Sequence, residues 1–459
     1  MPFVIFIVYV LLSYVYPGEI FPALAPYRIT YWVGLTGLGF ATLWLIFKKS
    51  APLTTVQLWF LVAFTVTSVI SRMLAERWMG AVVPTLIQFG PSLAMFVLAI
   101  CCIDSLRRLK IAAGWMVLLS LALVVQGVAA YHFGYKANMF LFDPVTRAEY
   151  DPNAPAPDDP EGLEDVSYTP DDQVSEGDEN TAVRIRGLGL LHDPNDLALG
   201  LIMALPLLGA GWRRKANMRN LVFVILPAAA LVYGLFLTRS RGGALALAVT
   251  LCFVVSRKVG RVSAALLFAV VIASGIASEF ASGRQVSVSD ESATGRVEAW
   301  TEGFEMLKAG PFLGAGFGQF LEHHELTAHN SFVLCFAETG LIGYFFWLGL
   351  LVITYVQLQS LAGLSEQRPI DRDIRQWART LQSSMVGFLA AAFFLSRTFV
   401  PMLYLLLGLG VALIAIAQSV NSPVSRPSPF RLGTILVASE IGSILFIYVL
   451  VKVNLALLA

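Results

Sequence analysis

The chain has 459 residues, of which 57% are hydrophobic and only 14% are charged, and its formal net charge is +1. Ordinary globular domains carry roughly a quarter charged residues, so this composition excludes a water-soluble globular protein. The balanced charge gives no reason to expect a nucleic-acid partner. The lipid bilayer is therefore the expected solvent.

Apolar runs recur along nearly the whole chain, and about 20 apolar residues are enough to cross the hydrocarbon core. The predicted spans lie near residues 1–16, 29–47, 57–73, 84–102, 110–130, 194–211, 219–238, 242–256, 261–278, 330–358, 380–397, 400–419 and 432–451. The sequence thus predicts an all-α polytopic membrane helix bundle of about 12–13 transmembrane helices. The short run at 242–256 and the merging of two runs around Pro401 leave the number open between these two values.

Basic residues mark alternate loops, and Lys and Arg accumulate on loops that stay in the cytoplasm. The clusters are Lys48 and Lys49; Arg107, Arg108 and Lys110; Arg213, Arg214, Lys215 and Arg219; Arg257, Lys258 and Arg261; and Arg368, Arg372, Arg375 and Arg379. We therefore expect a cytoplasmic N-terminus and two long external loops. The predicted organisation is N-terminal helices over 1–130, an external loop over 131–193, central helices over 194–278, a second external loop over 279–329 and C-terminal helices over 330–459.

The first external loop has two unlike parts. Residues 143–179 are rich in Asp, Glu and Pro, a composition that cannot bury enough apolar area to order itself, so we expect a solvated insert. A calcium-binding or partner-docking loop is the alternative, but no EF-hand spacing is present. Arg184 and Arg186 follow, and two cations beside a membrane surface suit a phosphate-bearing ligand as well as lipid headgroups.

The next segment reads Asp193-Pro194-Asn195-Asp196. Asp193 is predicted to cap the following helix, with Pro194 at its first position. Asn195 is the candidate for a polar rim around a sugar.

Two arginines, Arg239 and Arg241, stand between two apolar runs and precede a glycine pair. An arginine at a membrane boundary costs free energy unless it reaches water or finds an anion. Headgroup anchoring is one interpretation, and we favour a diphosphate site in which Arg241 ranks ahead of Arg239.

In the second external loop an amphipathic helix is expected to begin at Arg296, because apolar residues recur from there at spacings of three and four. Thr294 is its predicted cap, which would place Arg296 unfavourably in the first turn with respect to the helix dipole. Gly310-Pro311 ends the helix, and Gly314, Gly316 and Gly318 form a predicted flexible connector.

Three histidines follow, and His323, Glu325 and His329 match none of the compact metalloenzyme spacings, so no metal is expected. His329 stands with Asn330 where the chain re-enters the membrane, a place where a ring can be held rigidly and still face water, as a proton acceptor requires. The alternative is that His329 merely caps the helix. Glu338 lies deeper on about the opposite face and is expected to satisfy a buried polar partner.

The ordered set of these elements resembles the O-antigen ligase and polymerase family over about residues 180–350. It comprises Arg184-Ile185-Arg186-Gly187, residues 193–198, Ser240-Arg241-Gly242, Arg296 with Trp300, residues 310–316, and His329-Asn330-Ser331 with residues 338–343.

The resemblance implies an integral membrane glycosyltransferase of the bacterial inner membrane, with its active site facing the periplasm and no cofactor. The donor would be an undecaprenyl-diphosphate-linked glycan, and the acceptor a lipid A core sugar, a growing polysaccharide or a protein. Carried over residue by residue, the family's basic and histidine positions become Arg241, Arg296 and His329, with Arg239, Arg184, Arg186, Asn330 and Asn195 as expected substrate-binding residues. Within this class a ligase and a repeat-unit polymerase remain alternatives, and a transporter or flippase is the alternative from another class.

Overall fold

The computed structural model describes residues 2–48, 55–142, 183–213, 215–260, 263, 291–424 and 428–458. Within these ranges β-structure is confined to one antiparallel ladder, in which β1 (Leu141–Phe142) pairs with β2 (Arg184–Ile185). The predicted solvated insert at 143–179 and the predicted span at 261–278 lie outside the described residues, apart from Ser263.

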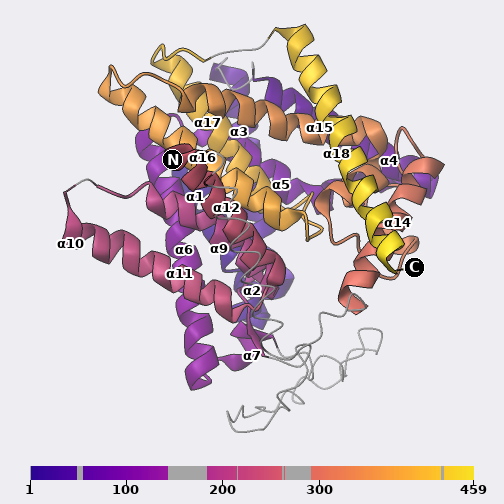
Figure 1. The fold of residues 1–459 in the computed structure, drawn as a ribbon, viewed down its shortest axis with the longest axis horizontal. Helices are drawn as coiled ribbons and strands as arrows, with labels where there is room; N and C mark the ends of the chain where they lie inside the picture. The colour runs from indigo at the N-terminus through magenta and orange to yellow at the C-terminus, as the bar shows by residue number, and fades with distance from the viewer. Residues whose placement is uncertain are drawn as a thin grey trace.

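The other regular elements of the described residues are helices (Figure 1). The helices are α1 (Pro2–Tyr14), α2 (Pro17–Ile20), η1 (Pro22–Tyr27), α3 (Ile29–Lys48), α4 (Val56–Glu76), η3 (Met79–Ala81), α5 (Val82–Cys102), α6 (Leu106–Phe133), α7 (Ala137–Phe140), η6 (Gly189–Leu191), α9 (Pro194–Gly209), α10 (Asn217–Asn220), η7 (Leu221–Ile225), α11 (Leu226–Leu237), α12 (Arg241–Val259), α14 (Glu291–Ala309), η8 (Phe320–Glu322), α15 (Ser331–Ala362), α16 (Pro369–Ala392), α17 (Pro401–Ser419) and α18 (Pro429–Leu458).

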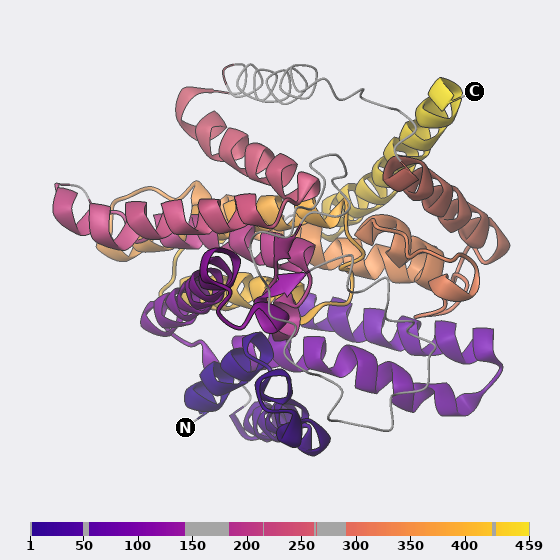
Figure 2. The same cartoon turned by 90° about the horizontal axis from the view of Figure 1, so that it is seen from below.

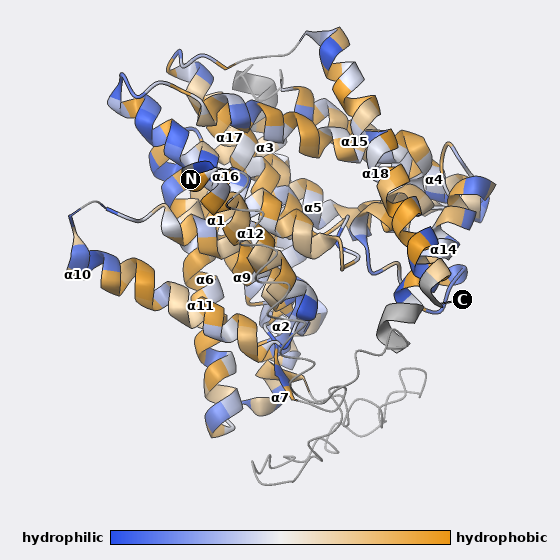
Figure 3. Ribbon diagram, in the orientation of Figure 1, coloured by the Kyte–Doolittle hydropathy of each residue, from blue (hydrophilic) through white to orange (hydrophobic). Residues whose placement is uncertain are grey.

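Seven helical segments among the described residues are long and apolar enough to cross a membrane: α4, η3–α5, α6, α10–α11, α15, α17 and α18. Figure 3 shows hydrophobic residues along the helices and hydrophilic residues gathered at many of their ends. The prediction of an all-α polytopic membrane bundle is therefore confirmed.

The predicted 12–13 spans exceed these seven because several predicted runs form shorter or less apolar helices. Helix α9 has 16 residues, and α16 begins with a strongly charged stretch and ends at Ala392, before the predicted limit of 397. The two runs around Pro401 are separate helices, since α17 begins at that proline. Helices α1 and α3 form at the first two predicted runs.

The core of the bundle is built around α17, whose side chains are almost all buried between Met402 and Ala417. Gly408 permits its close approach to α5, since a Cβ there would lie 2.6 Å from the Ala99 Cβ. Helix α18 packs on the outside against α14 and α15, at the edge of the molecule in both ribbon views (Figures 1 and 2).

An aromatic cluster supports the segments that carry the polar residues. Phe399, which precedes α17, stacks on Phe64 with ring centroids 5.6 Å apart and meets Phe317 edge-on at 4.6 Å. Phe89 joins the cluster against Phe399 at 5.7 Å. These rings fix the segment between α16 and α17 to the glycine-rich segment between α14 and α15.

Candidate functional site

His329 lies at the start of α15 in the left-handed backbone conformation, with φ +46°. The next residue, Asn330, caps the helix: its side-chain oxygen accepts the backbone N–H groups of Phe332 at 2.9 Å and Val333 at 3.2 Å. The alternative that His329 is the helix cap is therefore wrong. The His329 ring is half-buried and does not cap the helix.

Helix α14 holds the backbone just before the histidine. The Trp300 indole donates a 2.9 Å hydrogen bond to the carbonyl of Ala328, and its ring packs edge-on against Phe393. Arg296 lies one turn earlier than Trp300 on the same helix face. These two contacts of Trp300 hold α14 in place, so Arg296 lies near the start of α15, where His329 is.

The predicted start of α14 was wrong. The helix begins at Glu291, so Thr294 lies inside it and Arg296 lies beyond its first turn. The unfavourable placement of Arg296 against the helix dipole therefore does not apply. The predicted end is confirmed, because the helix stops at Ala309 before Gly310-Pro311.

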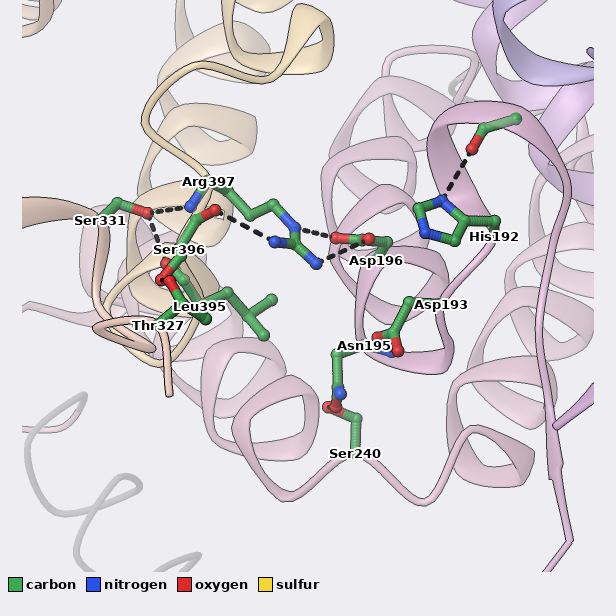
Figure 4. Close-up of polar contacts among 11 residues, drawn as sticks. His192, Asp193, Asn195, Asp196, Ser240, Thr327, Ser331, Leu395, Ser396 and Arg397 are labelled. Carbon is green, nitrogen blue, oxygen red and sulfur yellow. Dashed lines mark hydrogen bonds and ion pairs between the residues drawn. The ribbon is translucent and has the colours of Figure 1, made fainter. Parts of the chain in front are cut away.

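Arg397, on the segment between α16 and α17, is bound to the same helix start. Its backbone N–H donates to the Ser331 hydroxyl at 2.7 Å, and that hydroxyl donates to the Leu395 carbonyl at 2.5 Å. The neighbouring Thr398 hydroxyl donates to the Ser331 carbonyl at 2.6 Å. Figure 4 shows this segment wrapped against the start of α15.

The Arg397 guanidinium forms a two-pronged ion pair with Asp196 of α9 (Figure 4). Its Nη2 donates to Asp196 Oδ2 at 2.8 Å, its Nε donates to Oδ1, and its Nη1 donates to the Ser396 carbonyl at 3.0 Å. The Asp196 side chain is only 6% exposed. Sequence reasoning missed Arg397 by placing it inside a span. A lone cation in an apolar run was the available signal, since ionisable residues at such positions are default functional candidates.

The start of α9 is also joined to the start of α12. Asp193 caps α9 as predicted, accepting the Asn195 N–H at 2.8 Å, with Pro194 at the first position. The Asn195 side-chain oxygen accepts the Ser240 hydroxyl at 2.8 Å, and Ser240 in turn caps α12 by accepting the Gly243 N–H at 3.1 Å. The N-termini of α9, α12 and α15 therefore meet through Asn195–Ser240 and through Arg397.

The two arginines around Ser240 are exposed. Arg241 is the first residue of α12, and Arg239 precedes the cap with φ +50°. Both therefore lie at the same end of the bundle as Asn195.

Arg184 begins β2 and Arg186 follows it, and their contacts differ. Arg186 donates to the backbone carbonyls of Met139 at 3.1 Å and Asn138 at 2.8 Å. Arg184 lies over the Phe142 ring at 4.9 Å, and burial lowers its pKa while the charge of Asp193 opposes that shift. Arg184 is thus close enough to the capped start of α9 to interact with the Asp193 charge.

The charges around His329 set its protonation state. Burial lowers the pKa of His329 below its usual value, and the positive charges of Arg296 and Arg397 lower it further, while Asp193 opposes the shift. At neutral pH the imidazole is therefore uncharged. A neutral imidazole surrounded by guanidinium groups can accept a proton while the cations hold an anion.

Glu338 is deep in α15 and 4% exposed. Its carboxylate accepts the Phe320 backbone N–H at 3.3 Å, which confirms the expectation of a buried polar partner. The glycine-rich connector is not loose: Gly316 N–H donates to the Glu338 carbonyl at 3.1 Å, and Gly314, Gly316 and Gly318 all have positive φ. It docks where α15 is kinked at Gly340, φ +64°.

His323 is exposed and His324 bonds within its own turn, to the Leu326 backbone. In the part of the chain that the structure describes, no group of three or more His, Cys, Asp or Glu side chains is placed to hold a metal ion.

Taken together, the site belongs to a polytopic helical membrane protein with a cation-rich polar centre where three helix N-termini meet. Residues 226–348 match the family model for O-antigen ligase. This region is therefore similar to the O-antigen ligase family, in agreement with the resemblance predicted from the order of the motifs. No curated protein matches the chain.

The matched region includes Arg239, Arg241, Arg296 and His329. Asp196 and Arg397 lie outside it on both sides. The structure therefore brings residues from outside the matched region against residues within it.

Proposed function

We propose that the protein transfers a glycan from a polyprenyl diphosphate carrier to an acceptor hydroxyl. The observation that carries the proposal is the position of His329 at the capped start of α15, which Arg397 ties to the start of α9. The match to the O-antigen ligase family supports glycan transfer at the family level.

His329 acts as the general base. Its neutral ring accepts the proton of the acceptor hydroxyl, the resulting oxygen attacks the anomeric carbon, and the bond from that carbon to the diphosphate breaks. The lipid diphosphate leaves with the electron pair, and attack from the side opposite to it inverts the anomeric centre.

Arg241 and Arg296 bind the diphosphate. Guanidinium groups bind phosphate oxygens through paired hydrogen bonds, and fixed positive charge stabilises the negative charge that grows on the leaving group. Arg184 and Arg239 add cationic contacts. Arg186 holds the segment after β2 against α7 through the carbonyls of Met139 and Asn138.

The helix ends support the same anion. The first N–H groups of a helix carry partial positive charge, and α9, α12 and α15 all begin at this site. Asn195 and Asn330 hold these starts in place. We propose that Asn330 also contacts the sugar once substrate enters, because its side-chain nitrogen is buried with no hydrogen-bond partner among the described residues.

We place the site on the periplasmic face of the bacterial inner membrane. The support is that the basic clusters, which favour the cytoplasm, lie at the other end of α9 and α16. A cysteine replacing exposed His323 should react with a membrane-impermeant thiol reagent from outside, and one replacing Ser365 should not. The reverse pattern would contradict this orientation.

The test of function uses purified protein with an undecaprenyl-diphosphate-linked glycan and, in separate reactions, a lipid A core, a polysaccharide repeat unit and a protein acceptor. Which acceptor is glycosylated separates ligase, polymerase and protein-modifying activity. His329→Ala should slow transfer by about 10² to 10⁴, the usual range for one acid-base group, and His329→Asn should be equally slow. His323→Ala, at an exposed histidine of the same loop, is the matched control.

An active His329→Asn variant would contradict the base assignment. Movement of intact donor across vesicles without any new glycosidic bond would favour a flippase. Loss of transfer in the presence of a chelator would restore the metal alternative built on His323, Glu325 and His329.

A further inference from the structure

A partly polar cavity of about 570 Å³ lies at the end of the bundle away from His329. It is lined by Lys110 at the start of α6, Trp212, Arg213 and Arg219 around α10, and Asp373 and Trp377 at the start of α16. Asp196 lies at the opposite end of α9, and Arg397 follows the opposite end of α16. At 1.5 Å per residue, α9 separates the two sites by roughly 20 Å.

The cavity has an excess of positive charge. Lys110, Arg213 and Arg219 provide three cations in the lining, and Asp373 provides one negative charge. The Asp373 carboxylate accepts a hydrogen bond from the Lys110 ammonium at 2.6 Å. One cation is thus neutralised and two guanidinium groups remain for a ligand. A cavity of a few hundred Å³ matches the size of ordinary small-ligand sites.

Hydrogen bonds tie the Arg213 backbone and the Arg219 side chain to their neighbours. The buried Asn220 side chain accepts the Arg213 backbone N–H at 2.9 Å and donates to the Arg213 carbonyl at 2.6 Å. Arg219 Nη1 donates to the Gly211 carbonyl at 3.1 Å. The Arg219 guanidinium is thus held before a ligand arrives, and a preorganised group loses less conformational entropy when it binds an anion.

The tryptophans place the cavity at the membrane surface. Trp212 is 53% exposed, next to the cations, whereas Trp377 is buried in the wall. Tryptophan is enriched at the level of lipid headgroups, and basic pockets between transmembrane helices bind anionic headgroups there. Phe223, 63% exposed, adds an apolar lip on the helix that continues into the hydrocarbon.

We infer that this cavity binds the phosphodiester headgroup of an anionic phospholipid, with Arg213 and Arg219 on the phosphate oxygens and Trp212 at the glycerol level. The inference is independent of the proposed glycan transfer, because it uses none of the residues of that site. The ligand chemistry is an organic phosphate, and its source is the surrounding bilayer.

The experiment measures lipid retention by native mass spectrometry of the purified protein, with matched amounts of phosphatidylglycerol and phosphatidylcholine. We expect wild type to retain phosphatidylglycerol at least about tenfold better, the ratio that 1.4 kcal/mol gives. Arg213→Gln with Arg219→Gln should abolish this preference, and Arg213→Lys should lower it in part because lysine lacks the two-pronged fork.

Arg372→Gln is the matched control, since Arg372 is an exposed cation at the same end of the bundle, paired with Glu366 and outside the cavity lining. If the control and the double variant lost the preference for phosphatidylglycerol equally, the preference would arise from the overall charge of this surface, and the proposed site would be wrong. Equal retention of both lipids by wild type would also overturn it, whether or not the variants fold. Glycerol phosphate should compete only weakly, and full competition would show a soluble anion site instead of a lipid site.

Discussion

The ion pair between Arg397 and Asp196 predicts an asymmetric response to mutation. Arg397→Gln leaves the Asp196 carboxylate, 6% exposed, without its cation. Removing one partner of a buried pair costs about 3–5 kcal/mol, and the 24% exposure of Arg397 places the expected loss of unfolding free energy near the lower end, about 3 kcal/mol.

Asp196→Asn should cost less. The arginine keeps its 3.0 Å bond to the Ser396 carbonyl and its contact with water, so the loss is that of hydrogen bonds to a charged group, about 1.5–3 kcal/mol. The double variant has no stranded charge and should be no less stable than Arg397→Gln alone. This gives a coupling energy of about 2 kcal/mol, within the range for residues in direct contact.

The measurement is equilibrium unfolding of the purified protein in detergent micelles, followed by tryptophan fluorescence, for wild type, both single variants and the double variant. Additive effects of the two substitutions would refute the pair. So would an Arg397→Gln variant that is no less stable than Asp196→Asn.

Three further outcomes are expected. The transfer rate should fall with acidification only below the usual histidine pKa, because His329 must be neutral and its pKa is lowered. Arg296→Gln removes one cause of that lowering, so the acid limb should move to higher pH, and a limb that stays in place would contradict the assignment. Arg241→Ala should reduce transfer by about 10² to 10³, the loss typical of one preorganised electrostatic donor, with Lys restoring part of it; full activity in a stable variant would assign Arg241 to headgroup anchoring. Gly340→Ala should destabilise the protein by about 1–3 kcal/mol in thermal unfolding, because φ is +64° and a Cβ would lie 2.3 Å from the Phe312 backbone. Gly442→Ala is the control and should leave the stability unchanged, because a Cβ there would meet no atom within 4 Å.

The membrane bundle could be predicted from the sequence because apolar runs of sufficient length report the solvent directly. The ends of the helices were harder to predict from the sequence. Helix α14 begins at Glu291, before the apolar stripe from which its start was inferred. Helix α16 ends at Ala392, where hydropathy alone continues smoothly into Phe393, Phe394 and Leu395 and gives no stop signal.

The sequence offers Arg241 and His329 as candidate site residues because both stand next to turn signals. Arg397 carries no such signal, and its partner Asp196 lies 201 positions away in the chain. Only the packing of α9, α15 and α16 brings the two residues together. A sequence window can show that a cation is costly in an apolar run, but it contains no information about which distant carboxylate compensates it.

The ion pair with Asp196 limits what Arg397 can contribute to substrate binding. Its positive charge is already matched by Asp196, so its value to an incoming diphosphate is small beside that of Arg296 and Arg241. What Arg397 contributes is geometry: it connects the start of α9 to Ser331, two residues after His329. We therefore expect substitution of Arg397 to lower kcat through misplacement of the imidazole, and substitution of Arg241 or Arg296 to weaken donor binding and leaving-group stabilisation together. A KM for the lipid-linked donor that rises more in Arg397→Lys than in Arg241→Lys would reverse this division.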